Sequence, residues 1–311
     1  MRFMCSPRWY MIDTRVRFSS DSRFVPSHEP AVEGDLRKLE RFLKDKPKTL
    51  VLTGAGISTE SGIPDYRSEK VGLYARSNHK PIQHGDFINS EAVRKRYWAR
   101  NYVGWPRFSA VAPNVTHYKL ARLERDERIS GVVTQNVDKL HTKAGSKNVI
   151  ELHGSGYTVI CVGKTGAGCD YRIPRHDFQQ ILDQMNPHME DKSTMIRPDG
   201  DVELPHEYEE NFKIPPCPQC GGSLKPEIVF FGDNIPMPRI ETVVRMILES
   251  DGVLVLGSSL TVFSGYRIIL QAKELGIPVA IVNIGDTRGD SVADLKISAR
   301  CGELMQDLYK T

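Results

Sequence analysis

The apolar and polar positions near the start of the chain predict a helix, a strand and a glycine turn in succession. Over residues 35–46 the apolar positions follow the spacing of one helix face, and they are Leu36, Leu39, Phe42 and Leu43. Pro47 would end this helix. The run at 49–53 predicts a buried strand that enters the turn at 54–56, and this succession is typical of a nucleotide-binding α/β unit.

Further along the chain, short apolar runs alternate with helical patterns. Residues 68–128 are mixed and rich in aromatic side chains, and they favour helices and loops over strands. Further buried strands are predicted at 129–134, 227–231, 253–256 and 279–283, with helical stretches near 239–249 and 264–275. This alternation predicts an α/β fold with a Rossmann-like, mostly parallel sheet and helices on both of its faces.

Residues 155–224 differ in composition from the rest of the chain. They hold four of the six cysteines, with much proline, glycine and charge, which is typical of a structural zinc module. Cys217 and Cys220 have the two-residue spacing of a zinc knuckle, and Cys161 and Cys169 are candidates for the second pair. Four thiolates would form a closed tetrahedral site, and the alternative is a pair of free core thiols beside one knuckle.

Charge changes the picture only at the N-terminus. The 311-residue chain has a net charge of +3, with 40% hydrophobic and 26% charged residues, as is ordinary for a globular protein. Residues 1–28 contain five arginines, no lysine and two acidic residues, so the remainder is neutral overall. This arginine-rich, acid-poor start predicts a mitochondrial transit peptide over 1–28, with an ordinary disordered tail as the alternative.

The rest of the composition argues against two kinds of partner. A neutral body argues against nucleic acid as the main partner, because phosphate binding needs a concentrated basic face. No apolar run reaches the roughly 18 residues that a membrane-spanning helix needs, so the sequence predicts no membrane span.

The glycine turn taken alone is weak evidence for a dinucleotide site. Gly54 and Gly56 allow a pyrophosphate to approach the main chain closely, and a following helix would offer free N–H groups to it. The fingerprint G-x-G-x-x-G is incomplete because Thr59 stands at its last position. A plain tight turn is therefore nearly as good an interpretation.

Six short motifs, taken together and in order, resemble the signatures of the sirtuin family. They are GAGIS at 54–58, ESGIPDYR at 60–67, TQNVD at 134–138, ELHG at 151–154, FFG at 230–232 and GSSL at 257–260. The resemblance spans residues 50–300, and it is finest at 66–74 and 96–101, where the chain resembles the class II mitochondrial branch.

The resemblance implies roles for most of these residues. The loop 54–74 would wrap NAD as a mobile lid, and Val229 and Phe230 would flank a tunnel for the acylated lysine. Cys161, Cys169, Cys217 and Cys220 would hold structural zinc. The implied cofactor-binding residues are Gly54, Ala55, Gly56, Ile57, Ser58, Pro64, Asp65, Tyr66, Arg67, Tyr74, Gln135, Asn136, Val137, Asp138, Gly257, Ser258, Ser259, Asn283, Ile284, Gly285 and Cys301.

The implied activity is NAD-dependent deacylation of protein lysine, which releases nicotinamide and O-acyl-ADP-ribose. This chemistry needs a base for a ribose hydroxyl proton, and histidine suits that task near neutral pH. His153 follows a strand-like stretch and precedes a glycine, so we expect it to be the base, with Asn136 and Asp138 beside it. We interpret His141 as structural. The alternatives are a protein mono-ADP-ribosyltransferase and a low-turnover NAD-binding regulator of mitochondrial metabolic enzymes.

The sequence departs from the family pattern at the first cysteine pair, which is normally C-x-x-C. Seven residues separate Cys161 from Cys169, and we interpret 162–168 as an expanded loop with Cys169 still a ligand, a splice variant being the alternative. Lys164 stands at the usual position of the second ligand, three residues after Cys161, and it has no thiolate with which to bind zinc. Tyr74 and Arg76 lie where class II members place acyl-reading groups. Arg76 would either pair with a carboxylate on the acyl chain or be a solvated surface arginine.

One catalytic domain is therefore expected over 35–311. Its Rossmann-like part would combine 35–80, 129–154 and 225–311. A smaller zinc-binding and helical lobe would combine a helical insertion at 81–128 with the zinc module at 155–224. NAD and acyl-lysine would meet in the cleft between the lobes, with His153 at its floor. We expect acyl-lysine proteins of the mitochondrial matrix, metabolic enzymes above all, as its partners.

Overall fold

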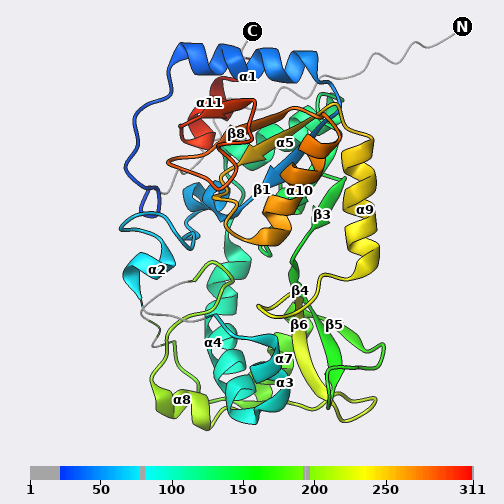
Figure 1. The fold of residues 1–311 in the computed structure, drawn as a ribbon. Helices are drawn as coiled ribbons and strands as arrows, with labels where there is room; N and C mark the ends of the chain where they lie inside the picture. The colour runs from blue at the N-terminus through cyan, green and yellow to red at the C-terminus, as the bar shows by residue number, and fades with distance from the viewer. Residues whose placement is uncertain (1–21, 78–80, 192, 194–196, 310–311) are drawn as a thin grey trace, which may run out of the picture.

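A six-stranded parallel sheet forms the larger of two lobes, the upper one in Figure 1. The computed structural model describes residues 22–77, 81–191, 193 and 197–309, so the first 21 residues of the predicted transit peptide lie outside the described residues. The strands lie in the order β3 (Val149–Glu151), β2 (Gly131–Thr134), β1 (Thr49–Thr53), β7 (Gly252–Leu256), β8 (Val279–Val282) and β9 (Leu295–Ile297), each parallel to its neighbour.

The strand order of this sheet reverses between β1 and β7. From β1 the chain builds β2 and β3 on one side, and it later builds β7, β8 and β9 on the other. In open parallel sheets, ligands bind beyond the carboxyl ends of the strands at such a switch point. The topology therefore directs attention to the loops that leave β1 and β7.

Both faces of the large sheet are covered, which is why its strands read as continuous apolar runs. Alternate side chains of each strand point to opposite faces, so Val51 and Leu50 belong to different clusters. Val51 packs with α1 (Glu33–Asp45), α5 (Val115–Arg125) and α11 (Cys301–Asp307). Leu50 packs with α9 (Met237–Leu248) and α10 (Phe263–Glu274).

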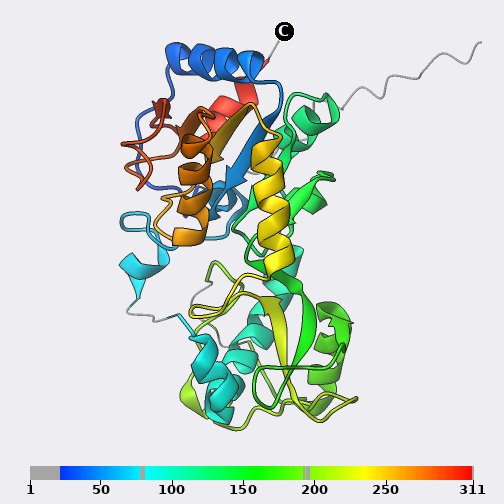
Figure 2. The same cartoon turned by 45° about the vertical axis from the view of Figure 1, so that its right-hand side comes forward.

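The smaller lobe is built on a three-stranded antiparallel sheet, seen below the large lobe in Figures 1 and 2. Its strand order is β5 (Arg172–Pro174), β4 (Gly154–Gly163) and β6 (Ser223–Ile228). Its helices are α3 (His84–Asn89), α4 (Glu91–Ala110), α7 (Arg175–Met185) and α8 (His206–Glu210). Trp98 and Phe178 are fully buried in the core that these elements share, with ring centroids 4.8 Å apart.

Three short helices complete the described elements. They are η1, a 3-10 helix over Ala55–Ser61, α2 (Leu73–Arg76) and α6 (Leu140–Lys143). η1 begins after Gly54, so the helix expected after the glycine turn is a short 3-10 segment that includes Gly56. In the described part of the chain, no helix is both long and apolar enough to cross a membrane.

The predicted fold class is confirmed, and three details of the prediction are wrong. The run at 227–231 is not a strand of the parallel sheet, because β6 ends at Ile228 and pairs antiparallel with β4. α5, which was expected in the smaller lobe, packs against α11 in the larger one. β9 was not predicted. An apolar run shows that a segment is buried, but it does not say which sheet or lobe buries it.

Candidate functional site

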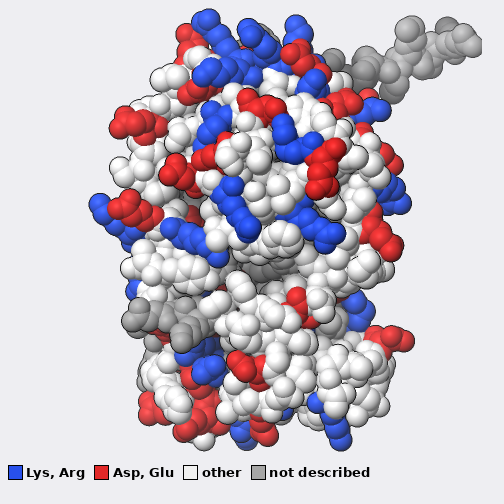
Figure 3. All heavy atoms as spheres, in the orientation of Figure 1, with Lys and Arg blue, Asp and Glu red and all other residues white. Residues whose placement is uncertain are grey.

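A cavity of about 1110 Å³ lies between the two lobes, at the carboxyl edge of the large sheet. Figure 3 shows the molecule hollowed between its upper and lower parts, with charges of both signs scattered over this face. The turn at 54–56, the loop 135–138 and the loop 257–264 form its upper wall. Residues 228–235 reach it from the end of β6. The position agrees with the switch point between β1 and β7.

Two loops meet at this switch point through their main chains. Gly54 N donates to Leu256 O over 3.2 Å, and Gly56 N donates to Gly257 O over 2.9 Å. A Cβ atom at Gly56 would lie 2.7 Å from Gly257 O, which is closer than such atoms approach. Gly257 has a φ of +57°, in the left-handed region that favours glycine. The glycines are thus required for the contact between the loops.

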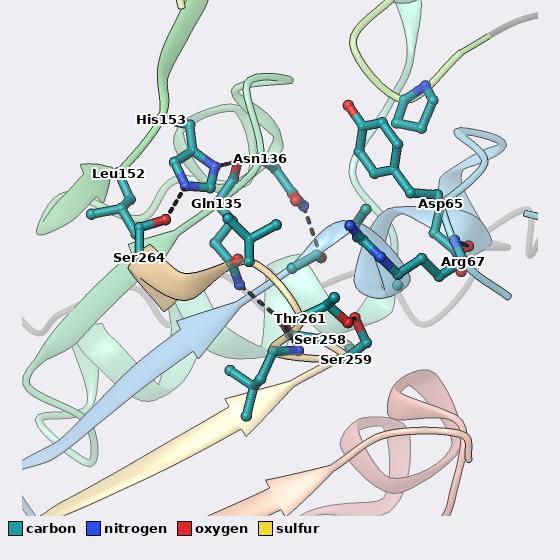
Figure 4. Close-up of a pocket in the computed structure, with 18 of the residues that line it drawn as sticks. Asp65, Arg67, Gln135, Asn136, Leu152, His153, Ser258, Ser259, Thr261 and Ser264 are labelled. Carbon is teal, nitrogen blue, oxygen red and sulfur yellow. Dashed lines mark hydrogen bonds between the residues drawn. The ribbon is translucent and has the colours of Figure 1, made fainter. Parts of the chain in front are cut away.

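His153 follows β3 and points into the cavity, between Gln135 and Ser264 (Figure 4). Its Nδ1 lies 3.0 Å from Gln135 O, and its Nε2 lies 2.8 Å from Ser264 Oγ. Because a carbonyl oxygen only accepts hydrogen bonds, Nδ1 carries the proton and Nε2 accepts from the serine hydroxyl. Burial lowers the pKa of His153 to about 4; the bond to Gln135 raises it and the charge of Arg239 lowers it. The ring is therefore neutral near pH 7, with Nε2 as the basic nitrogen.

A hydrogen-bond network joins the loop after β2 to the glycine turn. Asn136 Nδ2 donates to Gly54 O over 3.0 Å and to Ser58 Oγ over 3.1 Å. Ser58 Oγ donates in turn to Asp138 Oδ2 over 2.7 Å. Burial raises the pKa of Asp138, while its bonds from the Leu140 main chain and from Ser58 lower it. Asn136 and Asp138 thus fix the shape of the glycine turn.

Gln135 contributes its side chain as well as its main chain. Its Nε2 donates to Ser258 Oγ over 2.9 Å, which joins the loop after β2 to the loop after β7. A Cβ atom at Gly265 would lie 2.6 Å from Gln135 Oε1, so the start of α10 packs closely on this side chain. The Gln135 side chain is therefore held from two sides, directly beside His153.

The segment 65–76, which ends in α2, lines one side of the cavity with residues 65–69 and Leu73, and it is called the lid loop below. Asp65 Oδ1 accepts from the main-chain nitrogens of Arg67 and Ser68, at 3.0 and 2.8 Å. Leu73 N returns to Asp65 O over 2.8 Å, so the loop is closed on itself. Its rings and charges stack: the Arg67 guanidinium lies 5.5 Å from the Tyr74 ring centroid.

The loop after β8 forms the far end of the cavity. Asn283, Ile284 and Gly285 line it, together with Ser298. Gly285 N lies 3.4 Å from Ser298 Oγ, at the limit of a hydrogen bond. Polar main-chain groups and small side chains therefore meet at this end.

Aromatic side chains form the wall on the side of the smaller lobe. Phe230 lines the cavity, and its ring centroid lies 5.2 Å from that of Tyr97 and 5.3 Å from that of Phe87. Val229 N donates to His153 O over 2.8 Å, so this wall is joined to the main chain of the histidine itself. Apolar side chains thus line the same cavity as His153.

Most of the residues singled out from the sequence line this one cavity, and a few do not. Ile57 and Cys301 are buried in the core of the large lobe, where Cys301 Sγ lies 3.8 Å from Val282 O. Three others are not on the cavity wall: Pro64, Tyr74 and Arg76. Arg76 instead lies with its guanidinium carbon 5.0 Å from the centroid of the Phe24 ring.

Several lining residues were missed. Ser264 holds His153 Nε2, but a lone serine at the start of a helix carries no sequence signal. Asp199 and Asp201 enter from the long loop between α7 and α8, which composition assigned to the zinc module. Burial, together with the neighbouring charge of Asp199, raises the pKa of Asp201 to about 7. Arg197 lowers that pKa, and its Nη1 donates to Asp201 Oδ2 over 2.6 Å. Residues 26–28 also line the cavity, although they fall within the predicted transit peptide.

The four predicted cysteine ligands come together at one end of the smaller lobe. The sulfur atoms of Cys161, Cys169, Cys217 and Cys220 all lie within 4.8 Å of one another. Cys161 Sγ lies 3.4 Å from Cys220 Sγ, and Cys169 Sγ lies 3.5 Å from Cys217 Sγ. Zinc–sulfur bonds of roughly 2.3 Å in a tetrahedron put sulfurs roughly 3.8 Å apart, so the cluster fits a structural zinc ion.

The chain is similar to known proteins over nearly its whole length. A model of the Sir2 family matches residues 54–264. A protein of Drosophila melanogaster named NAD-dependent protein deacylase Sirt4 is 66% identical over 286 residues, covering 92% of this chain and 90% of that protein. A protein of Homo sapiens named NAD-dependent protein lipoamidase sirtuin-4, mitochondrial, is 50% identical over 282 residues, 91% of this chain and 88% of that protein.

Solved structures are similar in fold as well. A structure described as Sir2-p53 peptide-NAD+ has a TM-score of 0.68 and 30% sequence identity, covering 88% of this chain and 96% of that one. A structure of Sir2 bound to acetylated peptide also has a TM-score of 0.68, with 28% identity and the same coverage.

Proposed function

The chain belongs to the Sir2 family, and from this premise we propose that it is an NAD-dependent protein-lysine deacylase with His153 as its general base. The observation that carries the proposal is the geometry of that histidine. Its Nδ1 is fixed as a donor to Gln135 O, so the basic Nε2 faces the cavity beside Ser264. A general base must be unprotonated and within reach of the proton it removes, and His153 fulfils the first condition near pH 7.

The residues around the cavity fit NAD. Ligand pockets usually measure about 300–1,000 Å³, so a cavity of about 1110 Å³ offers room for a dinucleotide and an acyl chain together. The glycine turn and the loop at 257–259 present main chain and small side chains to it, as phosphate binding requires. Asn283 and Gly285 would hold the adenosine end, and Gln135, Asn136 and Asp138 would hold the nicotinamide end.

The division of labour in the reaction follows from these positions. NAD supplies the ADP-ribosyl group that accepts the acyl group from lysine. His153 takes a hydroxyl proton at Nε2, after Ser264 gives up its hydrogen bond to that nitrogen. Asn136 and Ser58 hold the glycine turn in place, and the lid loop would cover one side of the bound cofactor.

The acylated lysine would enter along the apolar wall formed by Val229 and Phe230. Its main chain would add as an extended strand beside residues 229–234 and 258–262, which both line the cavity. The human and bovine relatives are named lipoamidases, which makes lipoyl-lysine a substrate to test here.

The four cysteines would serve the structure of the smaller lobe. A closed four-thiolate site leaves no open position for a substrate, so the zinc would stabilise the sheet that supports Phe230. We propose the mitochondrial matrix as the location and acylated metabolic enzymes as substrates. Two observations support this: the human and bovine relatives are named mitochondrial, and residues 1–28 have the composition of a transit peptide.

The test is mass spectrometry of the purified chain with NAD and a panel of acyl-lysine peptides, including acetyl, lipoyl and carboxylate-bearing acyl groups. We expect loss of one acyl group matched by equal amounts of nicotinamide and O-acyl-ADP-ribose. A variant with His153→Tyr should lose turnover and keep its melting temperature. Zinc-loaded, folded protein that converts no peptide but transfers ADP-ribose to protein would overturn the proposal in favour of ADP-ribosylation.

A further inference from the structure

The segment 22–31 runs beside the cavity before it enters α1, and it is called the strap below. It is the dark blue stretch that descends from α1 in Figure 1. Pro26, Ser27 and His28 of the strap line the same cavity as His153 and the glycine turn. The strap is therefore part of the cavity wall, although no motif of the sequence assigns it a role there.

One end of the strap is fixed to α11. His28 Nε2 lies 3.0 Å from Glu303 Oε1, and Ala31 N donates to Glu303 Oε2 over 3.2 Å. His28 Nδ1 lies 3.1 Å from Pro26 O, so the histidine also fixes the turn of the strap itself. Both oxygens of one carboxylate thus bind the strap.

The same carboxylate belongs to a network that reaches the glycine turn. Arg300 Nε lies 3.4 Å from Glu303 Oε1 and 3.7 Å from Glu60 Oε2. Glu60 lies in η1, is almost fully buried, and accepts from Gly302 N over 2.9 Å. The position of His28 is consequently connected, through two carboxylates and one guanidinium, to η1, which follows Gly54 and contains Gly56.

The other end of the strap is fixed to the lid loop. The Arg76 guanidinium carbon lies 5.0 Å from the centroid of the Phe24 ring, within the range of cation–π attraction. Nε and Nη2 of Arg76 are buried and have no hydrogen-bond partner among the described residues. The contact with the Phe24 ring therefore stabilises this cation. Arg76 is the last residue of α2, the helix at the end of the lid loop.

We propose that the strap contributes to binding of NAD, and that Phe24 and His28 are positioning residues for the cofactor site. Phe24 holds the lid loop through Arg76, and His28 holds the edge of α11 and η1 through Glu303. The inference rests on the proposed function, since the cavity has to be the NAD site. It predicts that loosening either contact weakens binding of NAD and leaves the chemical step at His153 unchanged.

The experiment uses the full chain with single substitutions in the strap. Phe24→Ala and His28→Ala are compared with Phe24→Tyr and His28→Gln, which keep an aromatic ring and a hydrogen-bond donor. Val32→Ala is the matched control, because Val32 follows the strap and is 60% exposed. Calorimetric titration with ADP-ribose gives the affinity of the cofactor site without turnover. Steady-state assays give KM for NAD, KM for peptide and kcat.

We expect the two alanine variants to raise Kd for ADP-ribose and KM for NAD by about fivefold to tenfold, in line with cation–π and charged hydrogen-bond energies. KM for peptide and kcat should stay within twofold, and the tyrosine and glutamine variants should recover most of the affinity. Unchanged Kd and KM for NAD in both alanine variants would overturn the inference. A fivefold to tenfold fall in kcat without a change in Kd for ADP-ribose would also overturn it. Failure of the unsubstituted chain to bind ADP-ribose would instead overturn the proposed function.

Discussion

The main-chain oxygen of Gln135 and Nδ1 of His153 lie 3.0 Å apart, and this contact decides which nitrogen of the histidine is basic. The oxygen has no proton to give, so Nδ1 keeps its own and Nε2 is left with the free electron pair. Since the partner is main chain, no side-chain substitution at position 135 removes it. The tautomer is thus set by the backbone of the loop that follows β2.

This geometry predicts the effect of replacing His153. His153→Tyr removes the base, and general-base groups contribute about 10²- to 10⁴-fold to rate, so we expect kcat to fall by at least about 10²-fold. Titration with ADP-ribose should give an affinity within a few-fold of the unsubstituted chain. Deacylation at the unsubstituted rate would show that another group is the base.

The lowered pKa of His153 predicts the acid side of the pH profile. An unperturbed histidine titrates near 6.5, whereas burial lowers the pKa of His153 to about 4. The free enzyme therefore loses its base only at lower pH, and kcat/KM, which reports on the free enzyme, should stay level down to about pH 5.5. The measurement is the deacylation rate with NAD and peptide both well below their KM values, across pH 5 to 9, so that the free enzyme is the form that titrates. A fall centred at pH 6.5 would contradict the buried, neutral histidine.

Acid should destabilise the fold through a second buried histidine, His141. Burial lowers its pKa to about 3, and its Nε2 lies 2.9 Å from Thr53 Oγ1. Below pH 6.5 the unfolded chain binds a proton that the folded chain does not, so stability is lost as pH falls toward 3. This amounts to about 2 kcal/mol for His141 between pH 7 and pH 5.

Urea unfolding at the two pH values measures this loss. His141→Gln keeps a polar partner for Thr53 and cannot titrate, so we expect its loss of stability on acidification to be about 2 kcal/mol smaller. His206→Gln is the control, because the His206 side chain is 79% exposed. Equal pH dependence in all three chains would show that His141 does not carry the effect.

The larger lobe was largely predictable because its signals are local. The runs at 49–53, 253–256 and 279–283 are buried on both faces, and each became a strand of the predicted sheet. The run at 227–231 was assigned to the wrong sheet, because the sheet of β6 is decided by its pairing with β4, about 70 residues earlier in the chain. β9 is only three residues long, too short for a periodic pattern.

The site divides in the same way. Gly54, Gln135 and His153 belong to motifs with fixed spacing, and all three line the cavity. Ser264 and Asp201 reach it through packing of distant segments, which leaves no local pattern. The boundary of the transit peptide rested on composition, and composition could not show that residues 22–28 contact α11 and the lid loop.

Gly56 offers a test of the cofactor site that does not touch the chemistry. Its conformation suits any residue, but a Cβ atom there would lie 2.7 Å from Gly257 O and force the two loops apart. We expect Gly56→Ala to raise KM for NAD more than about tenfold, since a shift of 1.4 kcal/mol suffices for that. Gly85→Ala is the control, because a Cβ atom at Gly85 meets nothing within 4 Å. Equal KM values for NAD in both variants would place the cofactor elsewhere.

The last prediction concerns the unusual spacing of Cys161 and Cys169. Their sulfurs join those of Cys217 and Cys220 within 4.8 Å, so the seven intervening residues do not prevent a four-sulfur site. We expect one zinc per chain by elemental analysis, and a large loss of zinc and of melting temperature in Cys169→Ser, because metal binding and folding are coupled. Cys301→Ser should keep its zinc, since Cys301 lies in the core of the larger lobe. Lys164→Ala should keep it too, since the Lys164 side chain is exposed and offers no thiolate. Full zinc content in Cys169→Ser would show that Cys169 is not a ligand, and the loop 162–168 would then not be an expanded knuckle.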